Sequence, residues 1–340
     1  MRVPVIDIEG KQLMPCSPTK ARHLLKTGEA KAAWSKVGIF YIKLNYAIQQ
    51  PRNQTLVIGV DPGSSFEGYS VVGTQDTVLN IMAEAPTHVK KAVAVRRSMR
   101  RARRHRNLRR RPCRENRHCH ASRLPPSTRS RWEAKARIVA QLGKLLPLTD
   151  VVVEDVKAPI FQGKGGQWAL SFSPLQVGKE HLSYLLQKLG LTLHKCAGHQ
   201  TADLRVAFGL TKTKRKDEKS FAAHCVDSWV MAANVSGAIR PTEQRLYYST
   251  EIRLYRRQLH RLQPETGGTR KPYGGTRSLG LKRGTLVNHP HYGLASVGGT
   301  LKGKLSLNAY ADNKRLTQGA KLADCQKLTA SVYRTTAVKM

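Results

Sequence analysis

The sequence is short of acidic residues. Its 340 residues include 22 Asp and Glu against 59 Lys and Arg, which gives a formal net charge of +37. Solubility does not require this excess, because a net charge of about 2 to 8 is enough to keep a small domain in solution. The composition therefore indicates a polyanionic partner, and nucleic acid is the class that fits.

The sequence also lacks long apolar runs. No window of about 18 apolar residues occurs, so no membrane-spanning helix is expected. The start, MRVPVIDIEG, carries acids where a secretory signal is apolar. No long amphipathic helix pairs the positive charge with an aromatic face, which disfavours a membrane-surface role. We expect a cytoplasmic protein.

Cysteine is scarce and scattered. The six Cys residues show no disulfide framework and are interpreted as reduced thiols. A weaker alternative is a zinc site within one short segment, formed by Cys113, His118, Cys119 and His120. Their spacing is not C-x2-C and no second pair follows, so no zinc is expected.

Arginine is in excess, and it is concentrated in one segment. Residues 96–117 contain twelve Arg among 22 residues and one acid, Glu115. The guanidinium group binds phosphate through paired hydrogen bonds and keeps its charge at any working pH. Good helix formers predict one continuous helix over residues 94–111, which would repel itself without a polyanion. The arginines expected to bind RNA phosphates are Arg96, Arg97, Arg100, Arg101, Arg103, Arg104, Arg106, Arg109, Arg110 and Arg111.

The order of expected elements predicts an α/β core between two smaller parts. Residues 1–50 read as a small α+β module with strands at 3–8 and 37–44 and a helix that begins at Pro18. Residues beyond 240 are basic and rich in short β-type runs. The core is expected to contain strands at 56–61, 67–73, 77–85, 150–156 and 191–195, helices at 128–145, 178–189 and 221–235, and an exposed charged loop at 212–219.

Four side chains of the core are candidates for catalysis. Asp61 closes one buried strand and Glu154 lies in another, where a carboxylate is costly unless something compensates for its charge. His224 and Asp227 are spaced i, i+3 and would share a helix face. If these elements meet, three carboxylates and an imidazole converge, and such oxygen ligands suit Mg²⁺ or Mn²⁺. Two such ions can support phosphodiester hydrolysis.

Each of these residues also has an ordinary structural interpretation. Asp61 could belong only to an Asp-Pro-Gly turn, and Glu154 could pair with a buried Lys or Arg. His224 could be a hydrogen-bonded core histidine, and Asp227 could be exposed. The order of an Asp strand, a basic helix, a Glu strand and a His-x-x-Asp helix is much more specific than any one of its parts.

That order resembles a known family. IGVDPGSSFEGYSVV is similar to the first RuvC nuclease motif, DVVVEDVKA to the second and HCVDSWVMAA to the third. The Arg segment resembles the bridge helix of transposon-encoded RNA-guided nucleases, relatives of the type II CRISPR effectors. Residues 3–34 resemble the module named for a Pro-Leu-Met-Pro motif, although the motif here reads Gln12-Leu13-Met14-Pro15. Together these features resemble the IscB and IsrB group. The stretch from Val156 to Ala223 has no HNH nuclease signature, so the chain looks like IsrB.

The resemblance implies an RNase H-like (RuvC) core split by an Arg-rich bridge helix, with an N-terminal α+β module and a basic β-rich C-terminal domain. It implies a Mg²⁺-dependent nickase that is directed by a guide RNA and cuts the non-target strand with two ions. The expected partners are a structured guide RNA and double-stranded target DNA that carries a short adjacent motif. One protein copy is expected in the complex. The implied catalytic and metal-binding residues are Asp61, Glu154, His224 and Asp227. Arg270, Lys271 and Tyr273 are weaker candidates for reading the adjacent motif. The expected segments are 1–50, the N-terminal module; 51–90, RuvC-I; 91–122, the bridge helix; 123–158, RuvC-II; 159–240, RuvC-III; and 241–340, the motif-reading domain.

Two other functions stay open from the sequence. One is a RuvC-like junction resolvase that works without a guide RNA, although such enzymes are usually short and have no long Arg helix inside the fold. The other is an RNA-binding protein with a decayed nuclease core, against which the intact set of acids argues.

Overall fold

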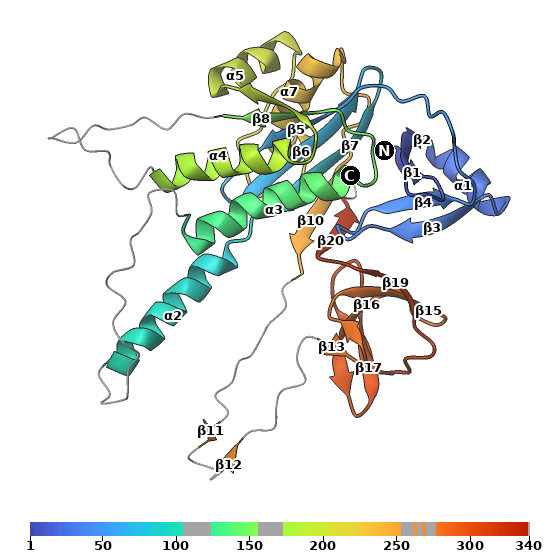
Figure 1. Ribbon diagram of the computed structural model, residues 1–340, viewed down its shortest axis with the longest axis vertical. Helices are drawn as coiled ribbons and strands as arrows, with labels where there is room; N and C mark the ends of the chain where they lie inside the picture. The colour runs from blue at the N-terminus through green and yellow to red at the C-terminus, as the bar shows by residue number, and fades with distance from the viewer. Residues whose placement is uncertain (105–123, 156–172, 253–261, 264–267, 270–276, 339–340) are drawn as a thin grey trace.

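A computed structural model describes residues 1–104, 124–155, 173–252, 262–263, 268–269 and 277–338. The fold is mixed α/β, with a central sheet flanked by helices (Figure 1). One smaller sheet precedes this central sheet in the sequence, and further small sheets are formed by residues beyond 260. Within the described residues, no helix is both long and apolar enough to cross a membrane.

The N-terminal module is a four-stranded sheet with one helix. Its order is β2-β1-β4-β3, so it has two more strands than the sequence predicted. Its helix starts as expected, because the Ser17 hydroxyl accepts a hydrogen bond from the Lys20 amide at 3.2 Å and Pro18 takes the first helical position. The elements are β1 (Val3–Ile6), β2 (Gln12–Cys16), α1 (Pro18–Lys26), β3 (Ala30–Trp34) and β4 (Phe40–Leu44).

The core is a seven-stranded sheet in the order β20-β10-β7-β6-β5-β8-β9. β5, β7, β8, β9 and β10 run in one direction, while β6 and the edge strand β20 run in the other. The five strands from β7 to β9, with β6 alone reversed, have the order expected of an RNase H-like sheet. The strands are β5 (Leu56–Asp61), β6 (Phe66–Gly73), β7 (Thr77–Glu84), β8 (Asp150–Glu154), β9 (Thr192–Cys196), β10 (Tyr247–Glu251) and β20 (Tyr333–Ala337).

Helices cover both faces of this sheet, and alternate residues of β5 face them. Leu56, Ile58 and Val60 pack in the cluster that contains α3 and α4, whereas Val57 packs in the cluster that contains α7. Asp61 lies four residues after Val57, so it is on the same face of the strand, the face covered by α7. The helices are α3 (Pro126–Leu142), α4 (Ser173–Gln187), α5 (Gly198–Ala207), α6 (Phe221–His224) and α7 (Val226–Ser236).

Two glycines let α6 and α7 lie unusually close to the sheet. A Cβ on Gly59 of β5 would stand 1.8 Å from the Ser228 carbonyl oxygen, and a Cβ on Gly68 of β6 would stand 1.9 Å from that of His224. No side chain fits in either place. The helix pair that carries His224 and Asp227 is therefore held directly on β5, which carries Asp61, and on its neighbour β6.

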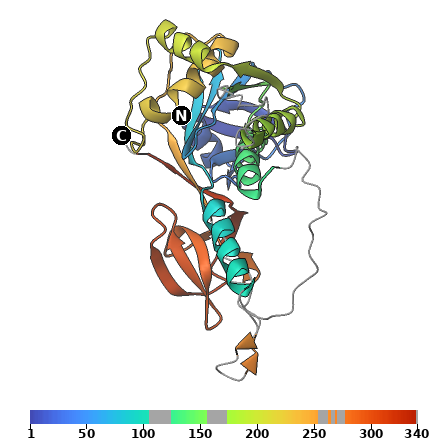
Figure 2. The ribbon, with the colours of Figure 1, turned by 90° about the vertical axis from the view of Figure 1, so that its left-hand side faces the viewer.

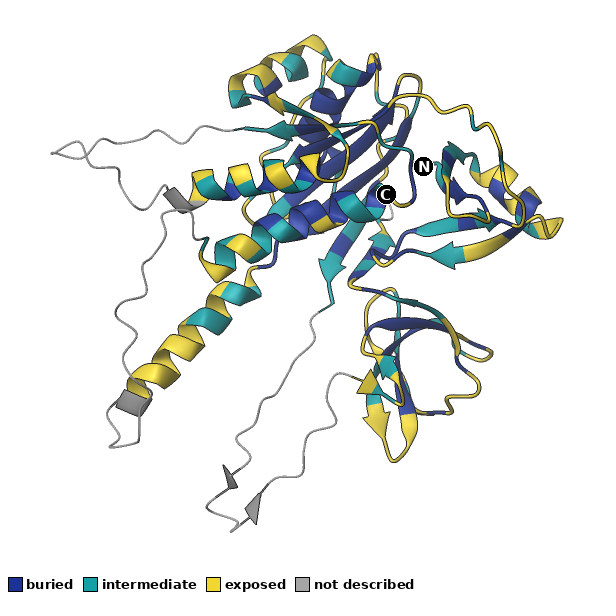
Figure 3. Cartoon of the chain, in the orientation of Figure 1, coloured by how far each residue is buried: buried dark blue, intermediate teal, exposed yellow. Residues whose placement is uncertain are grey.

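Two parts extend from the core toward the same end of the molecule (Figure 2). One is α2 (His88–Arg104), whose far half is exposed while the central strands are buried (Figure 3). The other, the C-terminal sheet, has the order β18-β17-β16-β15-β19. Its strands are β15 (Thr285–His289), β16 (Gly293–Leu301), β17 (Lys304–Ala309), β18 (Arg315–Ala320) and β19 (Gln326–Ala330), and two short hairpins precede it: β11 (Leu262–Gln263) with β12 (Gly268–Thr269), and β13 (Arg277–Ser278) with β14 (Leu281–Lys282).

Several elements differ from the sequence-based expectation. α2 begins at His88, six residues before the expected start at 94, and the described part ends at Arg104. The helix expected over 221–235 is broken at Cys225, where φ is −115°, so it forms α6 and α7. α5 was not expected. β10 and β20, both beyond residue 240, pair at the edge of the seven-stranded sheet.

Candidate active site

Asp61 and Glu154 lie side by side where two parallel strands end. β5 and β8 pair in parallel with Val60 opposite Val153, and each strand ends at the next residue. Each of the two carboxyl groups influences the pKa of the other. The sequence made the meeting of these two acids conditional on adjacent strands, and β5 and β8 are adjacent.

Asp227 reaches the same place from α7. Its side chain is only 4% exposed and accepts a hydrogen bond from Arg205 Nη1 at Oδ1, 2.5 Å away. Lys212 donates to Oδ2 of Asp227 and lies 3.4 Å from Oδ2 of Asp61. One ammonium group therefore bridges carboxylates that come from a strand and from a helix far apart in the sequence.

His224 lies beside this cluster. Its Nε2 is 3.0 Å from the Lys216 carbonyl oxygen, and its ring packs edge-on against Phe66 with centroids 5.1 Å apart. A carbonyl oxygen only accepts, so Nε2 carries the proton and the neutral ring keeps its lone pair on Nδ1. Burial lowers the pKa of His224, which favours that neutral form.

The carboxyl groups of the cluster lie close together and repel one another. Burial, followed by the charges of Asp61 and Asp227, raises the pKa of Glu154 to about 7, against the opposing effect of Lys212. Burial also raises the pKa of Asp61, again opposed by Lys212. The ammonium group thus stabilises ionised carboxylates that would otherwise repel one another.

The chemistry of these donors fits a small divalent cation. Partly buried carboxylates that repel one another are the oxygen ligands preferred by Mg²⁺ and Mn²⁺. As they stand, no three His, Cys, Asp or Glu side chains among the described residues are placed to hold a metal ion. Lys212 lies between Asp61 and Asp227 instead, and Arg205 pairs with Asp227. The Lys212 side chain belongs to a surface loop and is 35% exposed.

The predicted nucleic-acid contacts are only partly within the described residues. Arg96, Arg97, Arg100 and Arg101 lie on α2 and are exposed. Arg103 and Arg104 belong to α2, but their side chains are outside the description. Also outside the described residues are Arg106, Arg109, Arg110, Arg111, Arg270, Lys271 and Tyr273, together with Cys113, His118, Cys119 and His120.

Sequence reasoning missed two cations of the site. Lys212 belongs to the 212–219 segment, which is an exposed loop as expected, yet its ammonium end turns to the carboxylates. Arg205 belongs to α5, which was not expected at all. The one available signal was charge: a carboxylate in an apolar helix such as Asp227 requires a cation from a neighbouring element.

A buried ion pair was also missed. Lys135 of α3 lies 2.5 Å from Glu67 of β6, with side chains 3% and 1% exposed, and the Tyr69 hydroxyl donates to Glu67 at 2.6 Å. Glu67 therefore has the structural role that was considered as an alternative for Glu154.

This chain is similar to known proteins over part of its length. A protein-family model described as "RRXRR protein" matches residues 3–167, a little under half of the chain. Among solved structures, Thermus thermophilus RuvC in complex with a Holliday junction substrate is similar at 12% identity and a TM-score of 0.30, over 52% of this chain and 90% of that one. A further Thermus thermophilus RuvC structure is similar at 12% identity and a TM-score of 0.28, over 55% of this chain and 99% of that one. The comparison with curated proteins finds no match.

Proposed function

We propose that this protein is an RNA-guided DNA endonuclease of the IsrB type that nicks the non-target strand. The observation that carries the proposal is the meeting of Asp61, Glu154 and Asp227 at one end of the sheet, where a lysine ammonium bridges two of them. Carboxylates converging in this way suit hydrolysis of a phosphodiester, and a net charge of +37 suits a polynucleotide substrate.

Each residue of the cluster has a role in this reaction. Asp61, Glu154 and Asp227 would hold Mg²⁺, or Mn²⁺ in its place, as one ion or two, and His224 could add a nitrogen ligand. When bound, such ions stabilise the charge that develops on the attacking and leaving oxygens.

His224 offers a second role within the same geometry. Because Nε2 donates to the Lys216 carbonyl, Nδ1 can accept the proton of the attacking water. The hydrogen bond fixes the ring orientation, and burial keeps the ring neutral and ready to accept.

We assign the guide RNA to α2 and to the arginines that follow it in the sequence, the segment that resembles a bridge helix. Arg96, Arg97, Arg100 and Arg101 are exposed on α2, an element that extends from the core (Figure 3). Such an array binds a phosphate backbone without reading its bases. The segment beyond residue 240, with Arg270, Lys271 and Tyr273, is proposed to read a short motif beside the target. One protein copy with its RNA would act in the cytoplasm.

Nicking of a target plasmid tests the proposal. The full chain is purified with the RNA that accompanies it, that RNA is sequenced, and a supercoiled plasmid carrying the matching target is added with Mg²⁺. We expect a discrete structured RNA and conversion of the plasmid to the nicked circle. Asp61→Ala should abolish nicking and leave RNA binding intact, because it removes a ligand and no phosphate contact. Asp217→Ala, which removes an exposed carboxylate from the loop that contains Lys212, is the control.

The other outcomes each point elsewhere. Cleavage of a four-way junction without RNA would identify a resolvase. RNA binding without any cleavage would identify a non-catalytic RNA-binding protein. Efficient cutting of both strands by one copy would contradict a single nuclease site.

A further inference from the structure

A cavity of about 290 Å³ lies beyond the end of β5, on the side of the sheet covered by α3 and α4. We infer that it binds one unpaired nucleotide of the DNA strand, next to the phosphate that is cut; this rests on the proposed nuclease function. We call it the α3 pocket. The side chains used in the argument are Pro62, Ser64, Thr128, Arg131, Lys135 and Leu175.

The position of the α3 pocket is the first argument. Pro62 and Ser64 lie in the turn that directly follows Asp61, so the pocket begins where the candidate active site ends. A second, smaller cavity contains Glu154 itself, and Trp132 lines both cavities. A strand whose phosphate lies at the carboxylates can therefore place a neighbouring nucleotide beside α3.

The charge of the lining is the second argument. Its charged members are Arg131 and Lys135, and no acid is among the described residues that line it. Lys135 is neutralised by Glu67, but Arg131 donates to the uncharged Ser64 carbonyl and keeps its positive charge. A guanidinium has five N–H donors, so further donors are available for a phosphate. The hydroxyls of Ser64 and Thr128 lie in the same lining and can donate as well.

The size and apolar surface of the pocket favour an unpaired nucleotide over a base pair. The volume is near the lower end of small-ligand pockets, which suits a single nucleotide and not a base pair. Pro62 and Leu175 supply apolar surface for a sugar or base, and Leu175 is 42% exposed although it is a large apolar side chain. A strand displaced from its duplex, with its bases unpaired, meets these requirements.

Photocrosslinking of single-stranded DNA tests the inference without requiring cleavage. A short oligothymidylate containing iodouracil is irradiated with the full chain in EDTA, without guide RNA, and crosslinked peptides are identified by mass spectrometry. We expect crosslinks in peptides that contain residues 62–66, 126–142 or 173–187. Arg131→Gln should reduce these crosslinks about tenfold, the reduction expected when one charge-assisted hydrogen bond is removed. Arg131→Lys should restore a good part of the crosslinking.

A second pair of variants separates binding from folding. Leu175→Glu puts a negative charge at the mouth of the α3 pocket and should reduce the same crosslinks, while its exposure spares the core. Leu189→Glu, at a position 43% exposed and outside the pocket, and Arg129→Gln, on α3 but paired with Glu133, should leave them unchanged. Thermal unfolding should be the same for all these variants.

Crosslinks that map elsewhere, or that survive Arg131→Gln and Leu175→Glu, would contradict the inference that the α3 pocket binds DNA. This readout needs no nicking, so it stays separate from a failure of the proposed function. A wild-type protein that crosslinks through the α3 pocket but never nicks would support the binding site and contradict the enzyme.

Discussion

Glu154 is the carboxyl group on which pH should act most visibly. Burial and the neighbouring acids raise its pKa from 4.5 to about 7 in the folded protein. Between these two values the folded state holds a proton that the unfolded chain has released. The resulting contribution to stability is complete below the unfolded pKa and disappears as the pH rises through about 7.

We predict that the metal-free protein loses thermal stability between pH 4.5 and about 7 because Glu154 must ionise beside Asp61 and Asp227. Glu154→Gln should flatten this part of the profile, since its amide does not ionise. The measurement is thermal unfolding in EDTA as a function of pH. Glu218→Gln, at an exposed position, is the control, and equal slopes for wild type and Glu154→Gln would refute the assignment.

At the candidate site, sequence could identify the acids but not their cations. Asp61 and Glu154 stand out because a carboxylate that ends a run of Val and Ile needs compensation. Lys212 and Arg205 do not stand out, because a long flexible side chain reaches several ångströms from its backbone and its direction depends on tertiary contacts. Glu67 was missed for the same reason: its partner, Lys135, lies 68 residues away on a helix.

The contact of α7 with β5 is set by the absence of a side chain at Gly59. The closest approach there is to backbone, the Ser228 carbonyl oxygen, so no rotamer change can make room. Any displacement of α7 also carries Asp227 away from Asp61. The position of this helix is therefore coupled to the geometry of the cluster.

We predict that Gly59→Ala lowers the free energy of unfolding by about 1 to 3 kcal/mol or more, the usual cost of overpacking, and removes nicking. Urea unfolding and the plasmid assay measure the two effects. Gly143→Ala is the control: its Cβ would meet the nearest atom at 3.6 Å and its φ is −63°, so stability should be unchanged or slightly higher. Full activity in Gly59→Ala would show that α7 can shift freely.

The exposed arginines of α2 should set the salt dependence of RNA binding. Each phosphate that an arginine neutralises releases counterions, so the slope of log affinity against log salt should fall by about 0.7 to 0.9 for each arginine removed. We predict that replacing Arg97, Arg100 and Arg101 by Gln weakens binding and lowers the slope by about 2 to 3. Replacing Arg129, Lys144 and Lys188 by Gln removes the same number of charges and should lower the slope less. Filter binding over a salt series measures both, and an unchanged slope counts against α2.

The elements were predicted from sequence where local pattern decides them. β5, β6, β7 and β8 were found because buried strands read as apolar runs. α5 has no strong apolar face, and only Thr201 is buried among its residues, so periodicity gave no signal. The break at Cys225 lies next to the close contact of the His224 carbonyl with Gly68, a contact that a pattern within one helix does not contain.

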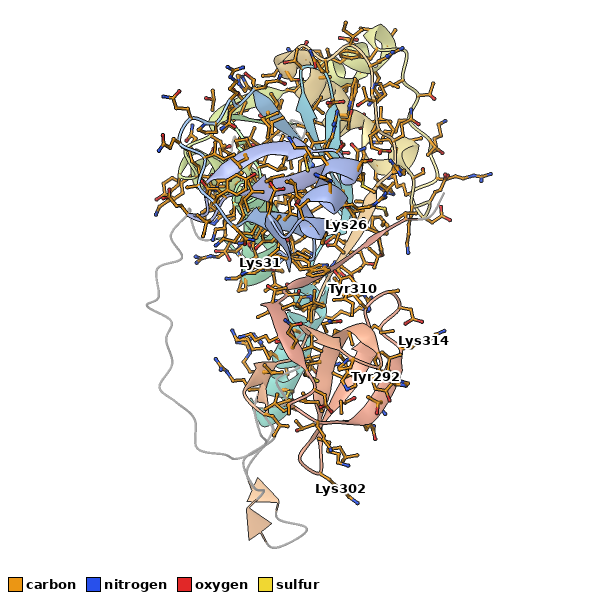
Figure 4. The ribbon with its side chains drawn as sticks, turned by 90° about the vertical axis from the view of Figure 1, so that its right-hand side faces the viewer. Lys26, Lys31, Tyr292, Lys302, Tyr310 and Lys314 are labelled. Carbon is orange, nitrogen blue, oxygen red and sulfur yellow. The ribbon has the colours of Figure 1, made fainter. Side chains whose placement is uncertain are left out.

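The C-terminal sheet meets the core and the N-terminal module at a seam around Tyr310 (Figure 4). The Tyr310 hydroxyl, at the end of β17, accepts from the Thr335 amide at 3.2 Å and lies 3.0 Å and 3.2 Å from the carbonyls of Thr335 and Gly38. The Val332 amide donates to the Lys36 carbonyl at 2.7 Å. The contacts of Tyr310 with Gly38 and of Val332 with Lys36 join residues 272 and 296 positions apart, and sequence patterning gave no sign of them.

We predict that Tyr310→Phe loosens this seam, because it leaves the Thr335 amide and two carbonyls short of a polar partner. The cost should be about 1 to 3 kcal/mol. Hydrogen exchange should show faster exchange of the amides from Val332 to Thr335, with β5 and β6 unchanged. Tyr292→Phe, which removes a hydroxyl elsewhere on the C-terminal sheet, should behave as wild type. If both variants exchange alike, the seam depends on the pairing of β10 with β20, and the Tyr310 hydroxyl is dispensable.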